Sequence, residues 1–388
     1  MEHPEERYYK LSRFLLSAIG LWPYQNKRNA RFKRTAITVI MLSITIVQMM
    51  NMFTSNANMD FLIEVGTTIV LTGGFLVQLH TRVIYVDKLK KLFEYMWNDW
   101  ALEKTDDEMK IMHQYAETTR LLTICSTLLT YICTVGFTSW IFMSKIFGIR
   151  QSVNKSHQII IPVKGYMMYD EERHFYLIQS FLCIIIFLLP LVYLANSSLY
   201  VALTQHVCSM CDLLGYRAER LFYVKDTTER DLNCGKIICE NITVFVQLHY
   251  NVIQFVNMIE TCHTIPFLMD LIGTVSGIGL SLIQITIFEN TERACIVICL
   301  IIIMLGYLMI PNYMGQQVTD MSLSIYEKVY NSAWYDADVS KQKSLLLIMM
   351  LRFHPFVVTA CKFYPMSLSS FKMIVQLAIS YSMFMRHI

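Results

Sequence analysis

Seven stretches of about 20 residues, nearly free of charged side chains, constrain the fold of this 388-residue chain more than any other feature. A helix of that length is about 30 Å long, which is the thickness of the hydrocarbon core of a bilayer. The composition agrees, because 54% of the residues are hydrophobic and only 16% are charged, too little charge for a soluble protein of this size. We therefore predict an all-α membrane protein with seven transmembrane helices.

The predicted spans divide the chain into four segments. Residues 1–34 form a polar, basic head, and residues 35–314 contain the first six spans with long helical extensions. Residues 315–365 form a cytosolic anchor segment, and residues 366–388 form the last span. The individual spans are predicted at residues 35–53, 61–80, 121–143, 175–200, 262–288, 294–314 and 366–388.

Lysine and arginine residues are concentrated on the side of the predicted membrane where the head lies. The head, residues 80–120 and 206–261, and residues 315–365 carry most of these cations. Cytoplasmic loops of membrane proteins carry such an excess. We therefore predict a cytosolic N-terminus and an extracellular C-terminus, the reverse of a G-protein-coupled receptor. Asn154 begins a glycosylation sequon in a loop that this topology places outside the cell.

The last span is more polar than the others. A helix that faced only lipid would gain nothing from hydroxyl and amide side chains, whereas one that lines water or packs on a neighbouring helix could use them. Lys372, its one charge before the final residues, either extends to the cytosolic interface or faces an aqueous vestibule. We expect this helix to border an ion path. Its polar side chains are Ser367, Ser369, Ser370, Gln376, Ser380 and Ser382.

Asp270 lies inside the fifth span, close to Gly273 and Gly277. The spacing of these glycines indicates close helix packing, and a charge inside a membrane is costly and often functional. Two interpretations stay open: a functional carboxyl group, or one that is protonated or satisfied by a neighbouring helix.

The sequence contains no nucleophile elbow, Walker loop or HExxH motif, so we expect neither enzymatic activity nor a cofactor. The net charge of +3 is small and spread out, which argues against nucleic acid as a partner. His206, Cys208 and Cys211, with Cys234 and Cys239, could in principle hold zinc. Scattered buried thiols are the more common arrangement, and no metal site is predicted.

The third span places Cys133, Gly136 and Trp140 on one stripe of a helix. A glycine beside a tryptophan leaves a dent with an aromatic wall. One interpretation is ordinary helix packing with Trp140 as an interfacial anchor. The other is the wall of a small apolar ligand pocket in the outer half of the bundle.

An apolar island, SLLLIMML at residues 344–351, lies in the segment predicted to be cytosolic. Eight residues are too few to span a bilayer. The island packs either within its own subunit or against another subunit, and we favour the second interpretation.

Several strings in the second half of the chain resemble the insect odorant receptors in their order and spacing. They are HVCSMCDLLGYRAERL, LHYNVIQFVNMIE, GYLMIPNYMGQQVTDMSLSIYEKVYNSAWYD and the terminal SLSSFKMIVQLAISYSMF. The first half is matched by topology and by the third-span stripe. The chain ends in Ser380-Tyr381 without the Gln-Phe pair of the sister gustatory receptors, and its second cytosolic loop is shorter than that of the family's co-receptor. It therefore resembles a ligand-tuning subunit.

The resemblance implies an odorant-gated, non-selective cation channel in the plasma membrane of sensory-neuron dendrites. This chain and an odorant co-receptor would form a heterotetramer around a pore lined by the seventh helices, including Gln376. The family's outer gate maps to Phe384, His387 and Ile388. His387 departs from the amide or apolar residue that is more common there.

The resemblance also implies a pocket for a small volatile apolar ligand, built on Cys133, Gly136 and Trp140. Dispersion and apolar burial would supply most of the binding energy. The other walls are expected at Thr68, Leu71 and Thr72 on the second span, Phe181 and Ile185 on the fourth, and Ile298 and Ile302 on the sixth.

The alternatives are a gustatory-type or G-protein-coupled chemoreceptor and a secondary transporter. The distribution of lysine and arginine opposes a G-protein-coupled receptor. A transporter would be favoured by inverted repeats and a helix broken at the midplane, and the sequence has no visible repeat.

Overall fold

The computed structural model describes the backbone of residues 4–54, 59–151, 175–222, 232–287, 291–336 and 338–386, with most of their side chains. Nearly all of this part is helical, which confirms the predicted all-α fold. The helices are α1 (Pro4–Arg7), α2 (Lys10–Ala18), α3 (Lys27–Thr54), α4 (Met59–Ile84), α5 (Val86–Ala101), α6 (Asp106–Gln151), α7 (Phe175–Glu219), α8 (Leu232–Ile287), α9 (Thr291–Tyr330), α10 (Val339–Met350) and α11 (Leu368–Arg386). Short 3-10 turns, η1 (Trp334–Asp336) and η2 (Leu351–Phe353), flank α10, and a ribbon of β1 (Thr359–Ala360) and β2 (Tyr364–Pro365) precedes α11.

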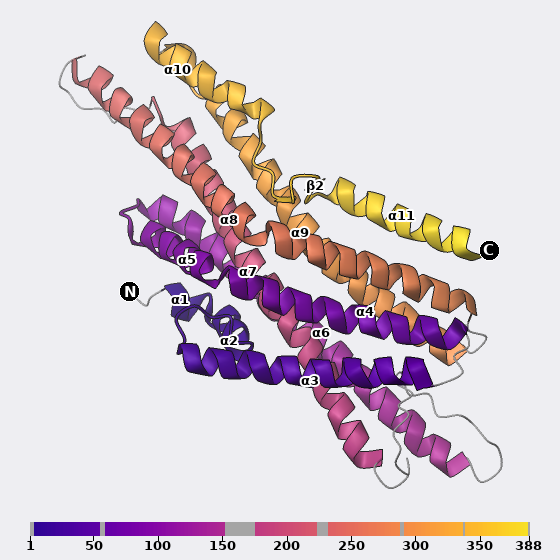
Figure 1. Ribbon diagram of the computed structural model, residues 1–388. Coiled ribbons are helices and arrows are strands. Elements are labelled where there is room, and N and C mark those ends of the chain that lie inside the picture. The colour runs from indigo at the N-terminus through magenta and orange to yellow at the C-terminus, as the bar shows by residue number, and fades with distance from the viewer. Residues whose placement is uncertain are drawn as a thin grey trace.

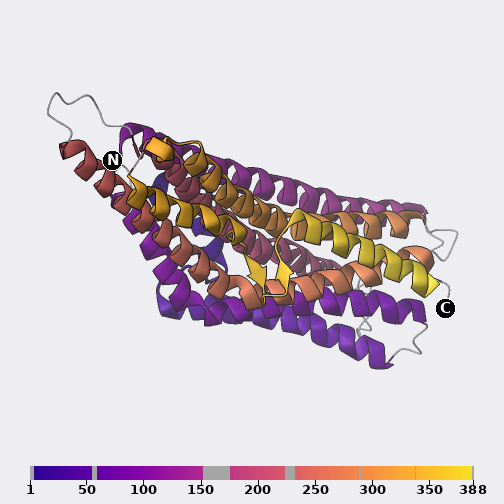
Figure 2. The same cartoon turned by 90° about the horizontal axis from the view of Figure 1, so that it is seen from above.

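Each predicted span coincides with one long helix of the bundle: α3, α4, α6, α7, α8, α9 or α11. In the described residues, α3, α6, α7, α8 and α9 are each long and apolar enough to cross a membrane. The pair α4 and α5, bent by 64° between them, adds a sixth candidate. Helix α11 has 19 residues, or about 28 Å, so its length suffices although its composition is more polar. The two termini lie at opposite ends of the bundle (Figures 1 and 2).

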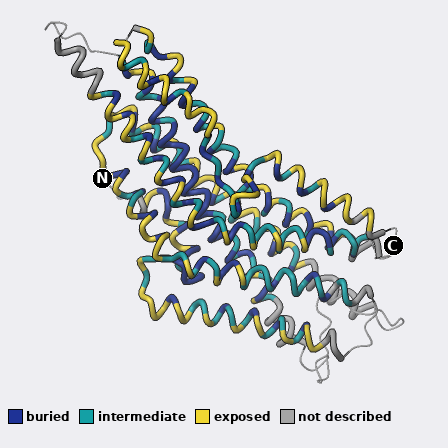
Figure 3. Tube along the Cα trace, turned by 45° about the horizontal axis from the view of Figure 1, so that its top comes forward, coloured by how far each residue is buried: buried dark blue, intermediate teal, exposed yellow. Residues whose placement is uncertain are grey.

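Four helices are much longer than a bilayer is thick: α6 has 46 residues, α7 has 45, α8 has 56 and α9 has 40. Their extensions pack with α2 and α5 into the most buried part of the molecule (Figure 3), where Leu92, Met96, Phe245 and Phe255 are almost fully buried. In contrast, only 11% of the most apolar window of α6 and 17% of that of α9 are buried within the chain. These windows are therefore available to lipid or to other subunits.

Three of the long helices contain a proline, at Pro190, Pro266 and Pro311. Proline has no backbone N–H, so the carbonyl group four residues earlier loses its helical partner. For Pro311 this carbonyl group belongs to Tyr307, and its oxygen accepts a 2.7 Å hydrogen bond from the hydroxyl group of Tyr193 on α7. A side chain of one helix thus completes the backbone of its neighbour, which surroundings without water require.

The connection from α10 to α11 is an antiparallel ribbon docked on α8. Its turn contains two non-glycine residues in the left-handed region, Cys361 with φ 52° and Lys362 with φ 63°. The Cys361 N–H donates a 2.6 Å hydrogen bond to the hydroxyl oxygen of Thr264, and the Thr359 hydroxyl group donates to the carboxylate of Glu260. These bonds to α8 hold an otherwise unfavourable backbone conformation in place.

Helix α11 lies along the outside of the bundle against α8 and α9 (Figures 1 and 2). Ser370, Ile374 and Ala378, spaced four residues apart, form its buried stripe. The predicted pore residues Gln376 and Phe384 are exposed instead, Phe384 to 62%. In one chain, most of the surface of α11 is therefore uncovered.

The segment that enters α11 touches α9 at a glycine, and this contact can be tested. A Cβ atom on Gly315 would lie 2.4 Å from the carbonyl oxygen of Met366. We expect Gly315→Ala to force the two segments apart and to lower the free energy of unfolding by about 1–3 kcal/mol. Thermal unfolding of the detergent-solubilised protein, followed by size exclusion, measures the change. The matched control is Gly306→Ala on the same helix, where nothing lies within 4 Å of the new Cβ atom. Equal stability of the two variants would contradict the proposed contact.

Candidate functional site

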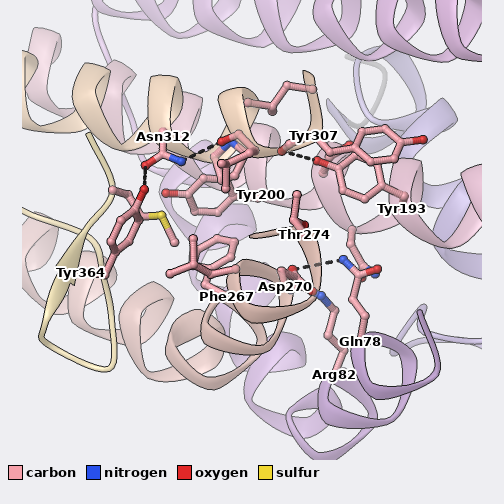
Figure 4. Close-up of a pocket in the computed structure, with 17 residues that line it drawn as sticks. Gln78, Arg82, Tyr193, Tyr200, Phe267, Asp270, Thr274, Tyr307, Asn312 and Tyr364 are labelled. Carbon is pink, nitrogen blue, oxygen red and sulfur yellow. Dashed lines mark hydrogen bonds and ion pairs between the residues drawn. The ribbon is translucent and has the colours of Figure 1, made fainter. Parts of the chain in front are cut away.

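A cavity of about 40 Å³ lies inside the bundle, between α4, α7, α8, α9 and the segment that enters α11 (Figure 4). Its lining combines charged and hydrogen-bonding side chains with apolar ones. The residues are Gln78, Arg82, Tyr193, Asn196, Ser197, Tyr200, Phe267, Asp270, Leu271, Thr274, Tyr307, Leu308, Ile310, Pro311, Asn312, Tyr364 and Met366.

One wall of the cavity carries an ion pair between two helices. Arg82 Nη2 on α4 lies 3.9 Å from Asp270 Oδ2 on α8, and the Gln78 side-chain amide donates a 3.1 Å hydrogen bond to the same oxygen. The Arg82 guanidinium group also lies over the ring of Phe267, 5.9 Å from its centroid. The carboxyl group of Asp270 is therefore satisfied by a neighbouring helix, which is the second of the two interpretations offered by the sequence.

The opposite wall is built from aromatic and amide side chains. The rings of Tyr193 and Tyr307 stack with centroids 3.5 Å apart, beside the hydrogen bond from Tyr193 to the carbonyl oxygen of Tyr307. Nearer to α11, the Tyr364 hydroxyl group donates a 3.0 Å hydrogen bond to Asn312 Oδ1, and Asn312 Nδ2 donates to the carbonyl oxygen of Leu308. Burial raises the pKa of Tyr364 to about 12, so the phenol keeps its proton at neutral pH and remains the donor.

Several polar atoms that line the cavity have no hydrogen-bond partner among the described residues. They are Arg82 Nε, both amide atoms of Asn196 and the hydroxyl group of Tyr200. Asn196 and Tyr200 are each only 1% exposed. Unsatisfied buried polar atoms are rare in proteins and call for an explanation such as bound water or a ligand.

The predicted pocket residues on α4 face two different neighbours. Thr72 is buried and accepts a 3.4 Å hydrogen bond from the hydroxyl group of Thr45 on α3, and Thr68 is half-buried. Leu71 packs instead on a small apolar cluster shared by three other helices. The cluster consists of Ile278 on α8, Met304 on α9 and Ala378 on α11.

The predicted pocket residues on the other helices are not enclosed together in one chain. Ile185 on α7 is buried, whereas Cys133 and Gly136 on α6 are exposed. Ile298 and Ile302 on α9 are 44% and 62% exposed. A Cβ atom on Gly136 would meet nothing within 4 Å, so the space beside this glycine is open.

Five predicted site residues lie outside the described part of the structure, wholly or in their side chains. Trp140 and Phe181 belong to α6 and α7, but their side chains are not described. Asn154, His387 and Ile388 are not described at all.

The residues considered for zinc have other surroundings. His206 Nε2 lies 3.5 Å from Asp99 Oδ2, and Cys208 and Cys211 are free, buried thiols. No group of three metal-binding side chains occurs among the residues that the structure describes. This part of the chain offers no metal centre.

The sequence interpretation missed Arg82 and the residues around it. Arg82 lies two residues beyond the predicted end of the second span, whereas α4 continues to Ile84. A signal was present, since Asp270 inside a span calls for a partner of opposite charge. Nothing in the sequence marked Asn196, Tyr200 or Tyr364 as neighbours of that pair.

These features define a polytopic helical membrane protein with an internal polar site and an uncovered, partly polar terminal helix. The chain belongs to the 7tm Odorant receptor family, because the model of that family matches residues 58–379. Members of this family are odorant-gated cation channels of insects and not enzymes. The resemblance inferred from the sequence is therefore confirmed.

Individual relatives cover almost the whole chain. Odorant receptor Or2 of Anopheles gambiae is 22% identical over 369 residues, which are 95% of each chain. Odorant receptor 30a of Drosophila melanogaster is 23% identical and covers 96% of this chain and 95% of its own. The fold is similar to that of olfactory receptor OR5 of Machilis hrabei in complex with eugenol, with a TM-score of 0.74 and 12% identity over 98% of both chains.

The Arg82–Asp270 pair gives a second prediction. Arg82→Met or Asp270→Leu alone leaves one charge unpaired, and we expect a loss of about 3–5 kcal/mol in the free energy of unfolding. The double variant removes both charges and should recover most of that loss. Thermal midpoints of the solubilised proteins, arranged as a double-mutant cycle, measure the coupling.

The exposed pair Lys90 and Glu94, 3.6 Å apart on α5, is the control for this cycle. Its coupling should not exceed about 0.5 kcal/mol. A coupling of the same small size between Arg82 and Asp270 would show that the internal pair does not stabilise the bundle.

Proposed function

We propose that this chain is the odorant-binding subunit of a cation channel in the plasma membrane of sensory-neuron dendrites, with its N-terminus in the cytosol. The observation that carries the proposal is the arrangement of α11. One stripe of this helix packs on α8 and α9, while the face with Gln376 stays uncovered in a single chain. A helix of membrane-spanning length with hydroxyl and amide groups on an uncovered face suits a shared, water-filled pore.

Subunits would meet around this pore as a heterotetramer with an odorant co-receptor. The apolar island supports such an assembly, because α10 buries only part of its apolar surface within the chain. Leu345 and Ile348 are buried, whereas Leu347 and Met350 are more than 60% exposed. Exposed apolar surface of this kind is typical of subunit contacts.

The pore would be lined by Gln376 and closed toward the outside by Phe384, His387 and Ile388. Lys372, exposed near the other end of α11, would face the cytosolic vestibule.

The odorant would bind in the outer half of the bundle, between α4, α6, α7 and α9. Gly136 supplies open space there, and Ile185 supplies a buried apolar wall. Leu71 would contact the ligand and is already packed on the cluster that contains Ala378 of α11. This contact gives the pocket a direct path to the pore helix. The remaining walls would come from Cys133, Trp140, Thr68, Thr72, Phe181, Ile298 and Ile302.

Gating would follow a shift between two conformations. A small volatile apolar molecule that fits the pocket better when the pore helices are apart stabilises the open state by the difference between its two affinities. Ligand binding would displace Leu71, and the cluster around Leu71 would transmit this displacement to α11 because its side chains are closely packed.

Electrical recording tests this assignment. We expect Leu71→Ala, expressed with the co-receptor, to raise the odorant concentration for half-maximal current about tenfold, which corresponds to about 1.4 kcal/mol. Val77→Ala on the same helix is the control, because Val77 is 41% exposed and outside the cluster. An unchanged response of Leu71→Ala, at equal surface amount, would refute the role of Leu71.

Antibody access tests the topology. Epitope tags before Met1 and after Ile388 are compared on intact and permeabilised cells. We expect the C-terminal tag to be labelled on intact cells and the N-terminal tag only after permeabilisation, as the distribution of lysine and arginine requires. The reverse pattern would invert the channel and exclude an outer gate near Phe384.

A further inference from the structure

We propose that the cavity between α4, α7, α8 and α9 is a second ligand site, separate from the odorant pocket, that binds a small neutral molecule with a hydroxyl group and holds water when that molecule is absent. The polar lining of the cavity supports this site, and this support does not depend on the assignment of the odorant pocket.

The unpartnered atoms define the chemistry of the ligand. Arg82 Nε can only donate a hydrogen bond, while the amide of Asn196 and the hydroxyl group of Tyr200 can both donate and accept. Each such atom, left buried without a partner, costs about 1–3 kcal/mol. A hydroxyl group or a water molecule satisfies donors and acceptors together. The charges of Arg82 and Asp270 offset each other, so the occupant is neutral.

The size of the cavity sets the size of the ligand. A water molecule needs about 10–15 Å³ of such space, so a cavity of about 40 Å³ admits about three water molecules. One molecule with three or four non-hydrogen atoms fits in their place. The rest of the lining is apolar, with Phe267, Leu271 and Leu308 among its members. A short alkyl chain with one hydroxyl group therefore fits both the apolar and the polar part of the lining.

The cavity is distinct from the predicted odorant pocket. None of the pocket residues proposed on α4, α6, α7 and α9 lines it. Along α7, Tyr193 lies eight residues beyond Ile185, or about 12 Å. Along α4, Gln78 lies six residues beyond Thr72, or about 9 Å. Both steps run in the same direction, toward the entrance of α11.

An occupant of this cavity contacts the segment that positions the pore helix. Tyr364 and Met366, which lie just before α11, line the cavity. Pro311 and its neighbour Asn312, inside α9, line it as well. Figure 4 shows Tyr364 and Asn312 joined by their hydrogen bond at one end of the cavity. A bound molecule thus contacts both α9 and the segment that leads into α11. Its presence favours one of the two conformations of the channel.

Hydroxyl-radical footprinting tests occupancy without any channel current. Radicals form from bound water, so a buried side chain beside such water is oxidised, whereas a dry one is protected. Met366 lines the cavity, and Met314 is a matched control because each is 3% exposed and Met314 lies outside the lining. We expect Met366 to be oxidised about fivefold faster than Met314 in the full-length solubilised protein. Equal, slow oxidation of the two residues would mean a dry cavity and would overturn the proposal.

A short alcohol, 1-propanol, then tests the ligand. It should displace water and at least halve the oxidation of Met366 relative to exposed Met373, which corrects for radicals scavenged in solution. Tyr200→Phe removes the hydroxyl group and keeps the ring, so the protection should weaken several-fold. The proposal is supported if propanol protects Met366 in the unaltered protein and no longer protects it in Tyr200→Phe. If Met366 is oxidised by bound water but propanol does not slow this oxidation in the unaltered protein, the ligand assignment is wrong. The assignment is also wrong if propanol protects Met366 equally well in Tyr200→Phe.

Discussion

The structure depends on one constraint, which is that backbone N–H and C=O groups inside a bilayer need partners within the protein. Regular helices meet the constraint along most of their length. At Pro311 the helix cannot, and Tyr193 supplies the missing donor from the next helix. The same constraint acts on side chains, since Asp270 is held by Arg82 and Gln78 from α4. Helices that complete each other in this way cannot slide freely, so the polar contacts fix the register of an otherwise apolar bundle.

The sequence predicted the helices and their long extensions, but not the residues at which each helix begins and ends. An apolar run ends where lipid ends, but α8 and α9 continue far beyond because their extensions bury side chains such as Phe255 and Val318 inside the protein. These extensions mix polar and apolar residues, so the length of an apolar run does not mark where the helix ends. The ribbon before α11 was missed for a different reason, because Cys361 and Lys362 adopt left-handed angles that sequence does not suggest for non-glycine residues.

The candidate site was only partly accessible from the sequence. Asp270 was noticed because a charge among apolar residues is conspicuous, yet its partner Arg82 lay just outside the predicted span. Asn196 and Tyr200 are polar residues beside the predicted end of a span, where they attract no attention. These two residues become part of a site because α4, α7, α8 and α9 converge around one cavity. Distances between helices are not visible in the sequence. In the same way, the stripe with Gly136 could be read from helical spacing, but whether lipid or another helix covers it depends on how α6 packs.

Helix α8 has a mechanical consequence beyond these local contacts. Its 56 residues extend about 84 Å, more than twice the thickness of the hydrocarbon layer. The ribbon that leads to α11 is attached to it near Thr264, well away from either end. A tilt of about 5° around that point would move the N-terminal tip of α8, about 48 Å away, by about 4 Å. The helix is thus a lever, because a small rearrangement near the ribbon becomes a displacement of several ångströms at the far end of α8.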